Sequence, residues 1–326
     1  MITKIRLQEY GPFREAEFGL APLTVLVGPN ASGKTMAMEA LRRAQEAIRE
    51  AASLKALDRL EEIFYSAWSR KGATENTSIT FDNGKKVLSF PGTPSIEGFL
   101  PQIQLLKFEP ETMRKASYLE ARQIAVQQDG YGLATVLADM KLQDDERLEW
   151  IEEQVRSIIP SFEGVRFKRA QVPRTKGSVT GQELIFDMKD AHDISPSAVS
   201  DGTILVLGIV TSIASMTRSQ AEDKPTLILI DDLERGLHPR ALNELIACLR
   251  RMTEEMSVQI LATSHSPYLL DGLKSEEVRL TGFLDDGSAT ICELSEHPEF
   301  ERWKDVMTPG ELWATAGEDW IRDVRK

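Results

Sequence analysis

The chain has 326 residues, of which 41% are hydrophobic and 28% are charged, and its formal net charge is −12. These proportions are typical of a globular protein and exclude wholesale disorder. The acidic balance disfavours a constitutive nucleic-acid binder, although it leaves room for a local basic patch.

The first third of the chain is expected to form strands around a long helix. Ile2–Leu7 alternates apolar and polar residues like an antiparallel strand, whereas Leu23–Val27 is apolar enough for a buried strand. Helical spacing of apolar residues then extends over residues 37–69, which predicts a long or broken helix. An Asp-Asn-Gly turn within residues 79–90 predicts a hairpin, and Ile103–Phe108 predicts another strand.

The middle of the chain is expected to hold one long helix, two strands and a buried helix. Leu133–Ile159 has helical periodicity and stops at a proline. Val165–Val172 and Glu183–Met188 are strand candidates, and Ala191–Val199 reads as a polar, proline-containing loop. Ile204–Met216 is apolar on all sides, which predicts a helix that is buried all round.

In the last third, strands alternate with a helix. Leu227–Ile230 and Val258–Ala262 have the pattern of buried strands, and helical spacing over residues 242–252 lies between them. Strand, helix and strand in this order predict a parallel sheet. Val278–Phe283 and Thr290–Leu294 predict a further hairpin.

Two features predict a cytoplasmic location. The N-terminus lacks the apolar region of a signal peptide, and the longest apolar run, Ile204–Met216, is too short to span a bilayer. Cys248 and Cys292 are isolated, so both are expected to be reduced, without a disulfide framework or a metal cluster.

The strongest motif lies between the strand Leu23–Val27 and the following helix. It consists of Gly28, Pro29, Asn30, Ala31, Ser32, Gly33, Lys34 and Thr35. It fits the phosphate-loop pattern G-x-x-x-x-G-K-[ST], in which backbone N–H groups and a helix N-terminus cradle phosphates. Lys34 is expected to reach the β- and γ-phosphates of ATP, and the Thr35 hydroxyl to bind Mg²⁺.

A second motif ends the strand Leu227–Ile230 in two carboxylates. Asp231 is expected to hold Mg²⁺ through water, as the carboxylate after an apolar strand does in a Walker B element. Asp232 follows it, at the position that is expected to polarise the attacking water. A buried strand that ends in Asp is common, so this motif gains its weight from the phosphate loop.

Two further segments carry candidate site residues. Ser200 and Gly202 precede the apolar run 204–216, where a hydroxyl, a glycine and a helix N-terminus can form a second anion site. Alone, an ordinary N-cap is the simpler interpretation. His265 follows the strand Val258–Ala262, at the edge of a parallel sheet where ligands usually bind. A histidine there can sense a γ-phosphate or position a water.

These four elements, in this order, resemble the ABC-ATPase class, and most of all the branch of AAA-domain ATPases that contains RecF, the SMC heads and the OLD proteins. Val199–Thr203 is similar to the signature motif of this branch, and transporter subunits differ there. Glu234–Pro239 resembles the branch's Glu followed by a Leu-His-Pro turn, and Thr263–Pro267 resembles its His motif.

Two other stretches resemble a subgroup of stand-alone bacterial ATPases. One is Phe108–Arg114 with Asp129–Ala134, and the other is the tail Thr308–Trp320. Three tryptophans, Trp303, Trp313 and Trp320, lie near the C-terminus. They are expected either to pack a terminal helix onto the core or to form a docking surface for a partner.

The resemblance implies an α/β fold: an ABC-ATPase head whose mixed sheet has a parallel core around the phosphate loop, with an antiparallel β lobe and a helical lid. It implies one domain over residues 1–326, with 1–107 and 201–326 as the nucleotide-binding core. Residues 108–200 are then a lid insertion that ends at the signature motif. ATP and Mg²⁺ are expected between two copies, with the phosphate loop of one facing Ser200 and Gly202 of the other.

The chain departs from this family at Asp232, where Glu is usual. An Asp carboxylate is one methylene shorter and lies roughly 1.5 Å farther from the water. Misplacement on the order of 1 Å can slow a reaction about 10²-fold, so we predict slow hydrolysis, with Glu234 as a substitute base. Gln102 and Gln104 precede the Phe108 turn, and neither is assigned as the family's Q-loop glutamine.

The resemblance favours a regulatory ATPase that forms a homodimer or larger oligomer through ATP. It is expected to control a separate effector, a nuclease or toxin encoded nearby, in anti-phage defence. The 61 residues after His265 carry no nuclease-like carboxylate cluster, so a partner is expected to supply any cleavage. A transporter subunit is the least favoured class, and no membrane partner is expected.

The alternative function is that of a RecF-like repair ATPase that clamps duplex DNA. Its candidate DNA contacts are Lys85–Lys86, Arg166–Arg169 and Arg174–Lys176. Solvated strand edges are the simpler interpretation of these basic residues, so DNA is not the favoured partner.

Overall fold

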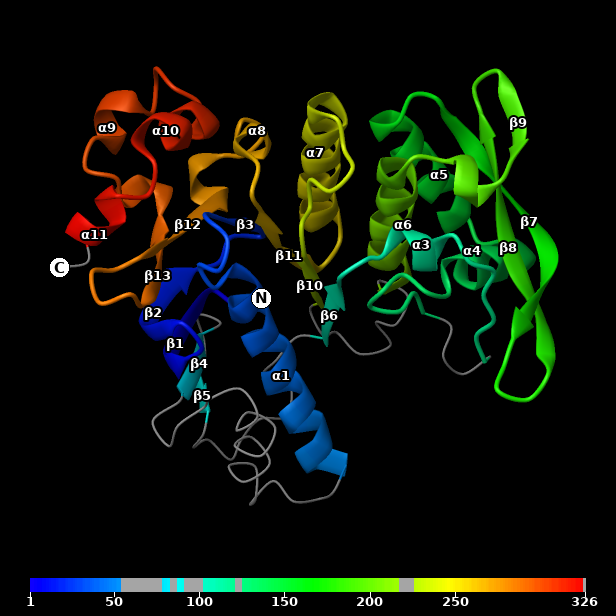
Figure 1. Ribbon diagram of the computed structural model, residues 1–326, viewed down its shortest axis with the longest axis horizontal. Coiled ribbons are helices and arrows are strands. Elements are labelled where there is room, and N and C mark those ends of the chain that lie inside the picture. The colour runs from blue at the N-terminus through cyan, green and yellow to red at the C-terminus, as the bar shows by residue number, and fades with distance from the viewer. Residues whose placement is uncertain (54–77, 83–86, 91–101, 121–124, 217–225, 325–326) are drawn as a thin grey trace. The chain divides into compact units, whose positions relative to one another are not determined.

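The computed structural model describes residues 1–53, 78–82, 87–90, 102–120, 125–216 and 226–324 (Figure 1). The chain divides into two compact units. Unit 1 comprises Met1–Leu105, Lys224–Leu233 and Met252–Lys326, and unit 2 comprises Leu106–Asp223 and Glu234–Arg251. The expected lid of residues 108–200 lies within unit 2, which also takes in residues 201–223 and 234–251.

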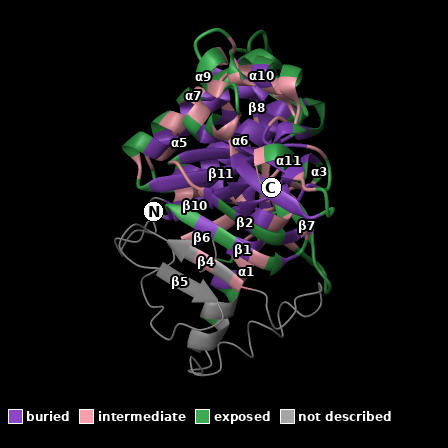
Figure 2. Cartoon of the chain, turned by 90° about the vertical axis from the view of Figure 1, so that its left-hand side faces the viewer, coloured by how far each residue is buried: buried purple, intermediate pink, exposed green. Residues whose placement is uncertain are grey.

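Unit 1 is built on a six-stranded sheet with the order β13-β12-β3-β11-β10-β6. Its strands are β3 (Leu23–Val27), β6 (Gln102–Leu106), β10 (Thr226–Ile230), β11 (Val258–Ser264), β12 (Val278–Phe283) and β13 (Ala289–Glu293). The strands β10, β11, β3 and β12 pair in parallel, and β13 returns antiparallel to β12. Every residue of β3, β10 and β11 is buried, as Figure 2 shows for β10 and β11. These pairings confirm the predicted parallel core and the last predicted hairpin. The complete burial of the central strands is typical of parallel sheets, which are covered on both faces.

A four-stranded antiparallel sheet, with the order β2-β1-β4-β5, forms the β lobe of unit 1. Its strands are β1 (Lys4–Tyr10), β2 (Phe13–Gly19), β4 (Ser78–Asp82) and β5 (Val87–Phe90). The hairpin predicted within residues 79–90 is confirmed by the β4–β5 pairing. Helix α1 (Lys34–Ser53) shares a buried apolar core with β1, β2 and the large sheet. The part of the expected helix beyond residue 53 lies outside the described residues.

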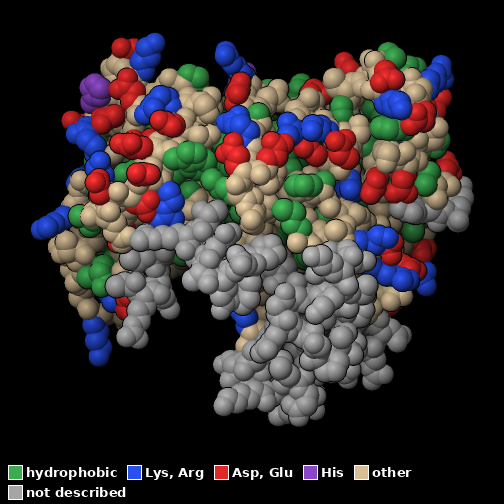
Figure 3. Space-filling model, turned by 180° about the vertical axis from the view of Figure 1, so that it is seen from behind, with side chains coloured by type: hydrophobic (Ala, Val, Ile, Leu, Met, Phe, Trp, Pro, Cys, Tyr) green, Lys and Arg blue, Asp and Glu red, His purple; other side chains and the backbone are tan. Residues whose placement is uncertain are grey.

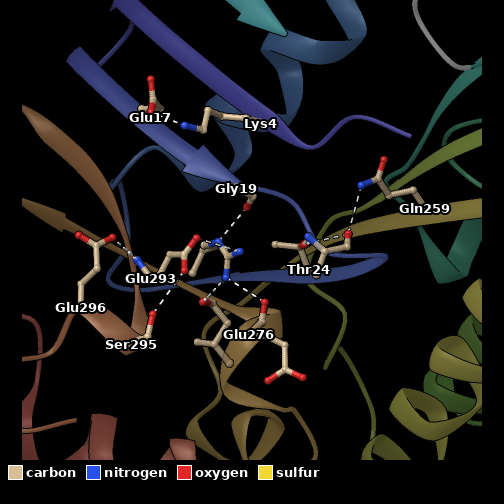
Figure 4. Close-up of polar contacts among 12 residues, drawn as sticks. Lys4, Glu17, Gly19, Thr24, Gln259, Glu276, Glu293, Ser295 and Glu296 are labelled. Carbon is tan, nitrogen blue, oxygen red and sulfur yellow. Dashed lines mark hydrogen bonds and ion pairs between the residues drawn. The ribbon is translucent and has the colours of Figure 1, made fainter. Parts of the chain in front are cut away.

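A buried arginine connects the two sheets of unit 1. The Arg279 side chain, on β12, is only 5% exposed and lies 3.3 Å from the Glu293 carboxylate. It donates hydrogen bonds to the carbonyl oxygens of Gly19 (2.8 Å), Glu276 (3.0 Å) and Val278 (2.9 Å). Figure 4 shows Gly19, Glu276 and Glu293 around this guanidinium. Burial lowers the pKa of Arg279, and the Glu293 charge opposes that shift.

Replacing Arg279 with methionine is expected to lower the free energy of unfolding by roughly 2–4 kcal/mol, because buried carbonyl groups lose their donor. Urea denaturation measures the change. Arg14→Met is a matched control, because Arg14 pairs with Asp286 at a side chain that is 70% exposed. Exposed ion pairs of this kind contribute little to stability. Equal losses for the two variants would contradict the connecting role of Arg279.

Unit 2 combines helices with a three-stranded sheet. Its helices are α3 (Pro110–Met113), α4 (Leu133–Leu142), α5 (Arg147–Ile158) and α6 (Asp201–Met216), and α7 (Pro239–Glu255) begins in it. The sheet has the order β7-β8-β9, with strands β7 (Phe162–Pro173), β8 (Ser178–Met188) and β9 (Ala191–Ile194). Almost every residue of α6 is buried, as its apolar sequence predicted.

Two expectations for unit 2 are corrected by the structure. The single helix expected over Leu133–Ile159 is divided, because Asp144 has a left-handed backbone (φ 51°) and the Asp145 carboxylate accepts a hydrogen bond from the N–H two residues on (3.1 Å). The loop expected over Ala191–Val199 contains β9, because Asp190, at φ 65°, allows the chain to turn back along β8.

Short helices lie in the C-terminal part of unit 1. They are α8 (Pro267–Leu270), α9 (Phe300–Trp303), α10 (Pro309–Ala316) and α11 (Trp320–Val324), and the tail Thr308–Trp320 contains α10. The Thr308 hydroxyl, at the N-cap of α10, donates to Asp271 (2.6 Å), and a Cβ at Gly310 would lie 2.5 Å from the carbonyl oxygen of Pro267. The tail motif therefore packs α10 closely on α8. Trp320 is 8% exposed and stacks edge-on with His297, which supports a packing role for this tryptophan.

The two cysteines are free thiols, and both are buried. Cys248, on α7, donates a weak hydrogen bond to Gln154 on α5 (3.6 Å). Within the described ranges, no helix has the length and apolar content that crossing a membrane requires.

Candidate functional site

The Gly28–Thr35 loop joins β3 to α1 in unit 1 (Figure 1). Its path requires residues without a side chain: a Cβ at Gly28 would lie 2.3 Å from the carbonyl oxygen of Thr281, and one at Gly33 would lie 2.5 Å from Phe13. Gly33 also has a left-handed backbone, with φ 92°. The loop ends at the N-terminus of α1, where the first backbone N–H groups of a helix are available to an anion.

Lys34 lies inside this loop and is 4% exposed. Its Nζ donates hydrogen bonds to the carbonyl oxygens of Gly28 (2.8 Å) and Pro29 (2.7 Å). The Ser32 hydroxyl also donates to Pro29 (2.8 Å), which closes the loop on itself. The ammonium group is thereby held among the backbone groups of the loop, where it can meet the charge of a bound phosphate.

Three oxygen-bearing side chains meet here: those of Thr35 in the first turn of α1, Asp231 after β10 and Thr263 near the end of β11. Asp231, directly after β10, accepts hydrogen bonds at Oδ1 from the hydroxyls of Thr35 (3.2 Å) and Thr263 (2.8 Å). Parallel pairing of β10 with β11, and of β11 with β3, brings these strand ends together.

The oxygen pair of Thr35 and Asp231 fits a Mg²⁺ ion, which binds oxygen ligands and is commonly held by one or two carboxylates plus substrate phosphates. Across the described part of the chain, no group of three or more His, Cys, Asp or Glu side chains is set to hold a metal. These residues therefore do not form a site in which protein side chains alone surround a metal ion. The donor set suits a cation that is shared with a phosphate ligand.

Asp232 and His265 lie close together beside this cluster. Asp232 has a left-handed backbone, with φ 55°, which Asp tolerates better than most non-glycine residues. Its N–H donates to the Thr263 hydroxyl (3.0 Å), so Thr263 contacts both Asp231 and Asp232. The Asp232 carboxylate lies 3.7 Å from Nε2 of His265, and these side chains are 51% and 41% exposed. The pair can orient a water or exchange a proton with it.

Ser200 and Gly202 lie in unit 2, at the start of α6. Ser200 caps the helix, because its Oγ accepts a hydrogen bond from the Thr203 N–H (3.2 Å). A Cβ at Gly202 would lie 2.4 Å from the carbonyl oxygen of Gly236, in the Leu-His-Pro turn. Ser200 and Gly202 also line a cavity of about 470 Å³, together with Gly236 and His238. The signature-like segment and the Leu-His-Pro turn therefore pack against each other.

Three residues without an assigned role in the sequence hold these segments in place. Thr263 links Asp231 to Asp232, as described above. Arg114 donates to the carbonyl oxygens of Pro196 (3.0 Å) and Val199 (2.9 Å). Arg235 donates to the carbonyl oxygen of Phe108 (3.1 Å). In the sequence, all three are visible only as members of family-like stretches, and none has a signal of its own.

The candidate residues are divided between the two units. Unit 1 brings together Gly28–Thr35, Asp231, Asp232 and His265, whereas unit 2 holds Ser200, Gly202 and Glu234. Gln102 and Gln104, the glutamines considered for the Q-loop, lie on β6.

Comparison with known proteins gives one family and a set of similar folds. Residues 125–271, a little under half of the chain, match the family described as "AAA domain, putative AbiEii toxin, Type IV TA system". The match includes Ser200, Asp231 and His265 but begins after the phosphate loop.

Among solved structures, the chain is similar to the Smc head domain with an extended coiled coil bound to the C-terminal domain of ScpA, derived from Pyrococcus furiosus. The identity is 13% and the TM-score 0.54, over 94% of this chain and 99% of that one. It is also similar to the SmcHead bound to the C-winged helix domain of ScpA, with 14% identity, a TM-score of 0.52, and coverage of 90% and 97%. At such identities the likeness shows the fold. The chain therefore has the fold of these Smc heads, and its residues 125–271 match the AAA-domain family.

Proposed function

We propose that this chain binds ATP with Mg²⁺, hydrolyses it slowly and works as a switch that pairs with a second copy around the nucleotide. The observation that carries the proposal is the junction of Lys34, Thr35 and Asp231. A buried ammonium group and a hydroxyl follow β3 there, and a carboxylate follows β10, which is joined to β3 through the parallel strand β11. This combination suits a phosphate chain and its cation.

In this proposal each residue has a distinct role. The backbone of Gly28–Thr35 and the Lys34 ammonium bind the phosphates, and Thr35 and Asp231 hold Mg²⁺, which neutralises phosphate charge when bound. Asp232 orients the attacking water and accepts its proton at a carboxylate oxygen, and His265 keeps that carboxylate in place from 3.7 Å. Glu234 is the alternative base.

A second copy completes the site through Ser200 and Gly202. These residues stand at the N-terminus of the 16-residue α6, so a hydroxyl and helix N–H groups are presented together to an anion. Pairing of this kind couples ATP binding to association, and hydrolysis then releases the two copies.

The partner that this switch controls is a separate protein effector, a nuclease or toxin, in anti-phage defence. The description of the matched family names a toxin and a TA system, and the two similar Smc heads are each bound to a domain of ScpA. Both findings support a protein partner for this chain.

DNA clamping is the alternative, and the basic residues give it little support. Arg166 pairs with Asp187 and Asp193, and Lys168 pairs with Glu183. The Arg166 guanidinium lowers the pKa of Asp187 to about 2, so these charges cancel at neutral pH. On the face seen in Figure 3, Lys and Arg side chains are interspersed with Asp and Glu. Lys85–Lys86 lies outside the described residues.

Steady-state ATP turnover measured against protein concentration, with and without duplex DNA, tests the proposal. We expect slow turnover that rises more than linearly with concentration and does not respond to DNA. Stimulation of several-fold by DNA at low salt would favour the clamping alternative. Turnover strictly proportional to concentration, with no ATP-dependent dimer in sedimentation experiments, would overturn the pairing.

A further inference from the structure

We propose that Arg114 positions the Ser200–Gly202 segment for the nucleotide held by a second copy, and that it does so without touching that nucleotide. The inference rests on the proposed function in one respect, namely that Ser200 and Gly202 complete the ATP site of another copy. It adds the residue on which that contact depends.

The geometry around Arg114 is unusual for a surface arginine. It follows α3, and its side chain is 11% exposed. Its Nε donates to the carbonyl oxygen of Pro196 (3.0 Å), and its Nη2 donates both to the carbonyl oxygen of Val199 (2.9 Å) and to the Asp201 carboxylate (2.5 Å). One planar group therefore fixes the backbone before Ser200 and the side chain after it.

This arrangement makes the Ser200 hydroxyl dependent on Arg114. Val199 and Asp201 flank Ser200 directly, so their two contacts restrict the backbone torsions on both sides of the hydroxyl. A lysine cannot replace them, because an ammonium is a single point charge, whereas a guanidinium offers donors in several fixed directions.

The element that carries Arg114 is itself anchored at its N-terminal end and along α6. The N–H of Glu109 donates to the carbonyl oxygen of Asp129 (3.0 Å), and Arg235 donates to that of Phe108 (3.1 Å). On the side of α6, a Cβ at Gly208 would lie 2.2 Å from Met113, so α3 rests directly on that helix. The segment 108–114 is thus a fixed support for the guanidinium.

Loss of Arg114 is therefore expected to affect association and turnover but not ATP binding by a single copy. Removing Arg114 leaves the Gly28–Thr35 loop of the same copy unchanged, so ATP binding by a single copy persists. The Ser200–Gly202 segment becomes loose, and misplacement of a catalytic contact on the order of 1 Å slows a reaction about 10²-fold. ATP-dependent association and turnover therefore fall together.

The test compares Arg114→Ala and Arg114→Lys with Arg156→Ala in the full chain. Arg156 is the matched control, because it also donates to one backbone carbonyl in unit 2, that of Glu163 (2.6 Å), far along the chain from Ser200. Three quantities are measured: binding of a fluorescent ATP analogue at low protein concentration, ATPγS-dependent dimerisation by sedimentation, and turnover against concentration. Thermal melting checks the fold of each variant.

We expect both Arg114 variants to bind the analogue like the wild type, while their dimerisation constant is weakened about 10-fold or more, and Arg156→Ala to behave like the wild type. Arg114→Ala should also make the further change Asp201→Asn silent, because the two residues share one contact. Wild-type-like dimerisation of Arg114→Lys, which retains the charge and the fold, would overturn the positioning role. If the wild type itself does not dimerise with ATPγS, the proposed function fails and this inference fails with it, which is a different result from a dimer that ignores Arg114.

Discussion

Replacing Asp231 with asparagine is expected to reduce Mg²⁺-dependent ATP turnover by about 10²-fold or more, and to raise the Mg²⁺ concentration needed for half-maximal activity. Asparagine keeps the side-chain oxygen that accepts hydrogen bonds from Thr35 and Thr263, at 3.2 and 2.8 Å, so the local structure should survive. The substitution removes only the negative charge. Turnover measured over a series of Mg²⁺ concentrations separates the loss of charge from a loss of fold.

The control for this experiment is Asp286→Asn, also in unit 1. Asp286 is hydrogen-bonded by Ser288 and paired with Arg14, which hold its pKa well below the usual range, but it belongs to a surface turn. We expect its turnover and Mg²⁺ dependence to match the wild type. An Asp231→Asn variant with an unchanged Mg²⁺ dependence would show that Asp231 does not hold the cation.

Replacing Asp232 with glutamate is expected to accelerate hydrolysis, by up to about 10²-fold in a single turnover, because the carboxylate moves on the order of 1 Å closer to the water. The backbone conformation at residue 232 reduces part of this gain in rate. Asp232 has φ 55°, a conformation that costs a longer side chain more than it costs Asp. The effect is therefore read from the rate of phosphate release at saturating ATP and high protein concentration.

Asp232→Gln separates the two contributions. Glutamine has the shape of glutamate but no carboxylate, so it carries the same backbone cost without the base, and we expect it to be slower than the wild type. A glutamate variant that is no faster than the wild type would count against the geometric explanation for slow hydrolysis. In that case Glu234→Gln becomes the informative variant, because it removes the alternative base.

Those parts of the fold that depend on local sequence were predictable. Leu23–Val27 matches β3 in its bounds, because a uniformly apolar run before a glycine loop has few other solutions. The helix expected over Leu133–Ile159 was wrong, because Leu148 and Ile151 are buried like the residues before the break, and apolar spacing does not report a turn made by Asp144 and Asp145.

The candidate site also has a part that local sequence predicts and a part that it does not. Lys34, Thr35 and Asp231 follow from motifs whose chemistry is local to a loop or a strand end, although their roles stay predictions. The contacts of Arg114 with Val199, of Arg235 with Phe108 and of Thr263 with Asp231 join segments 85, 127 and 32 residues apart. No periodicity in a single sequence records such pairs, so only three-dimensional structure reveals them.

The contact between Gly202 and Gly236 has a consequence for mutational tolerance. The backbones touch at this point: a Cβ on Gly202 would lie 2.4 Å from one carbonyl oxygen, and Gly236 has φ 70° with Asp201 at 3.1 Å from its own Cβ position. No substitution at Gly236 makes room for a side chain at Gly202, or the reverse, because glycine has no side chain that could be made smaller. In a saturation library, the two positions should therefore behave as independently intolerant, and never rescue each other.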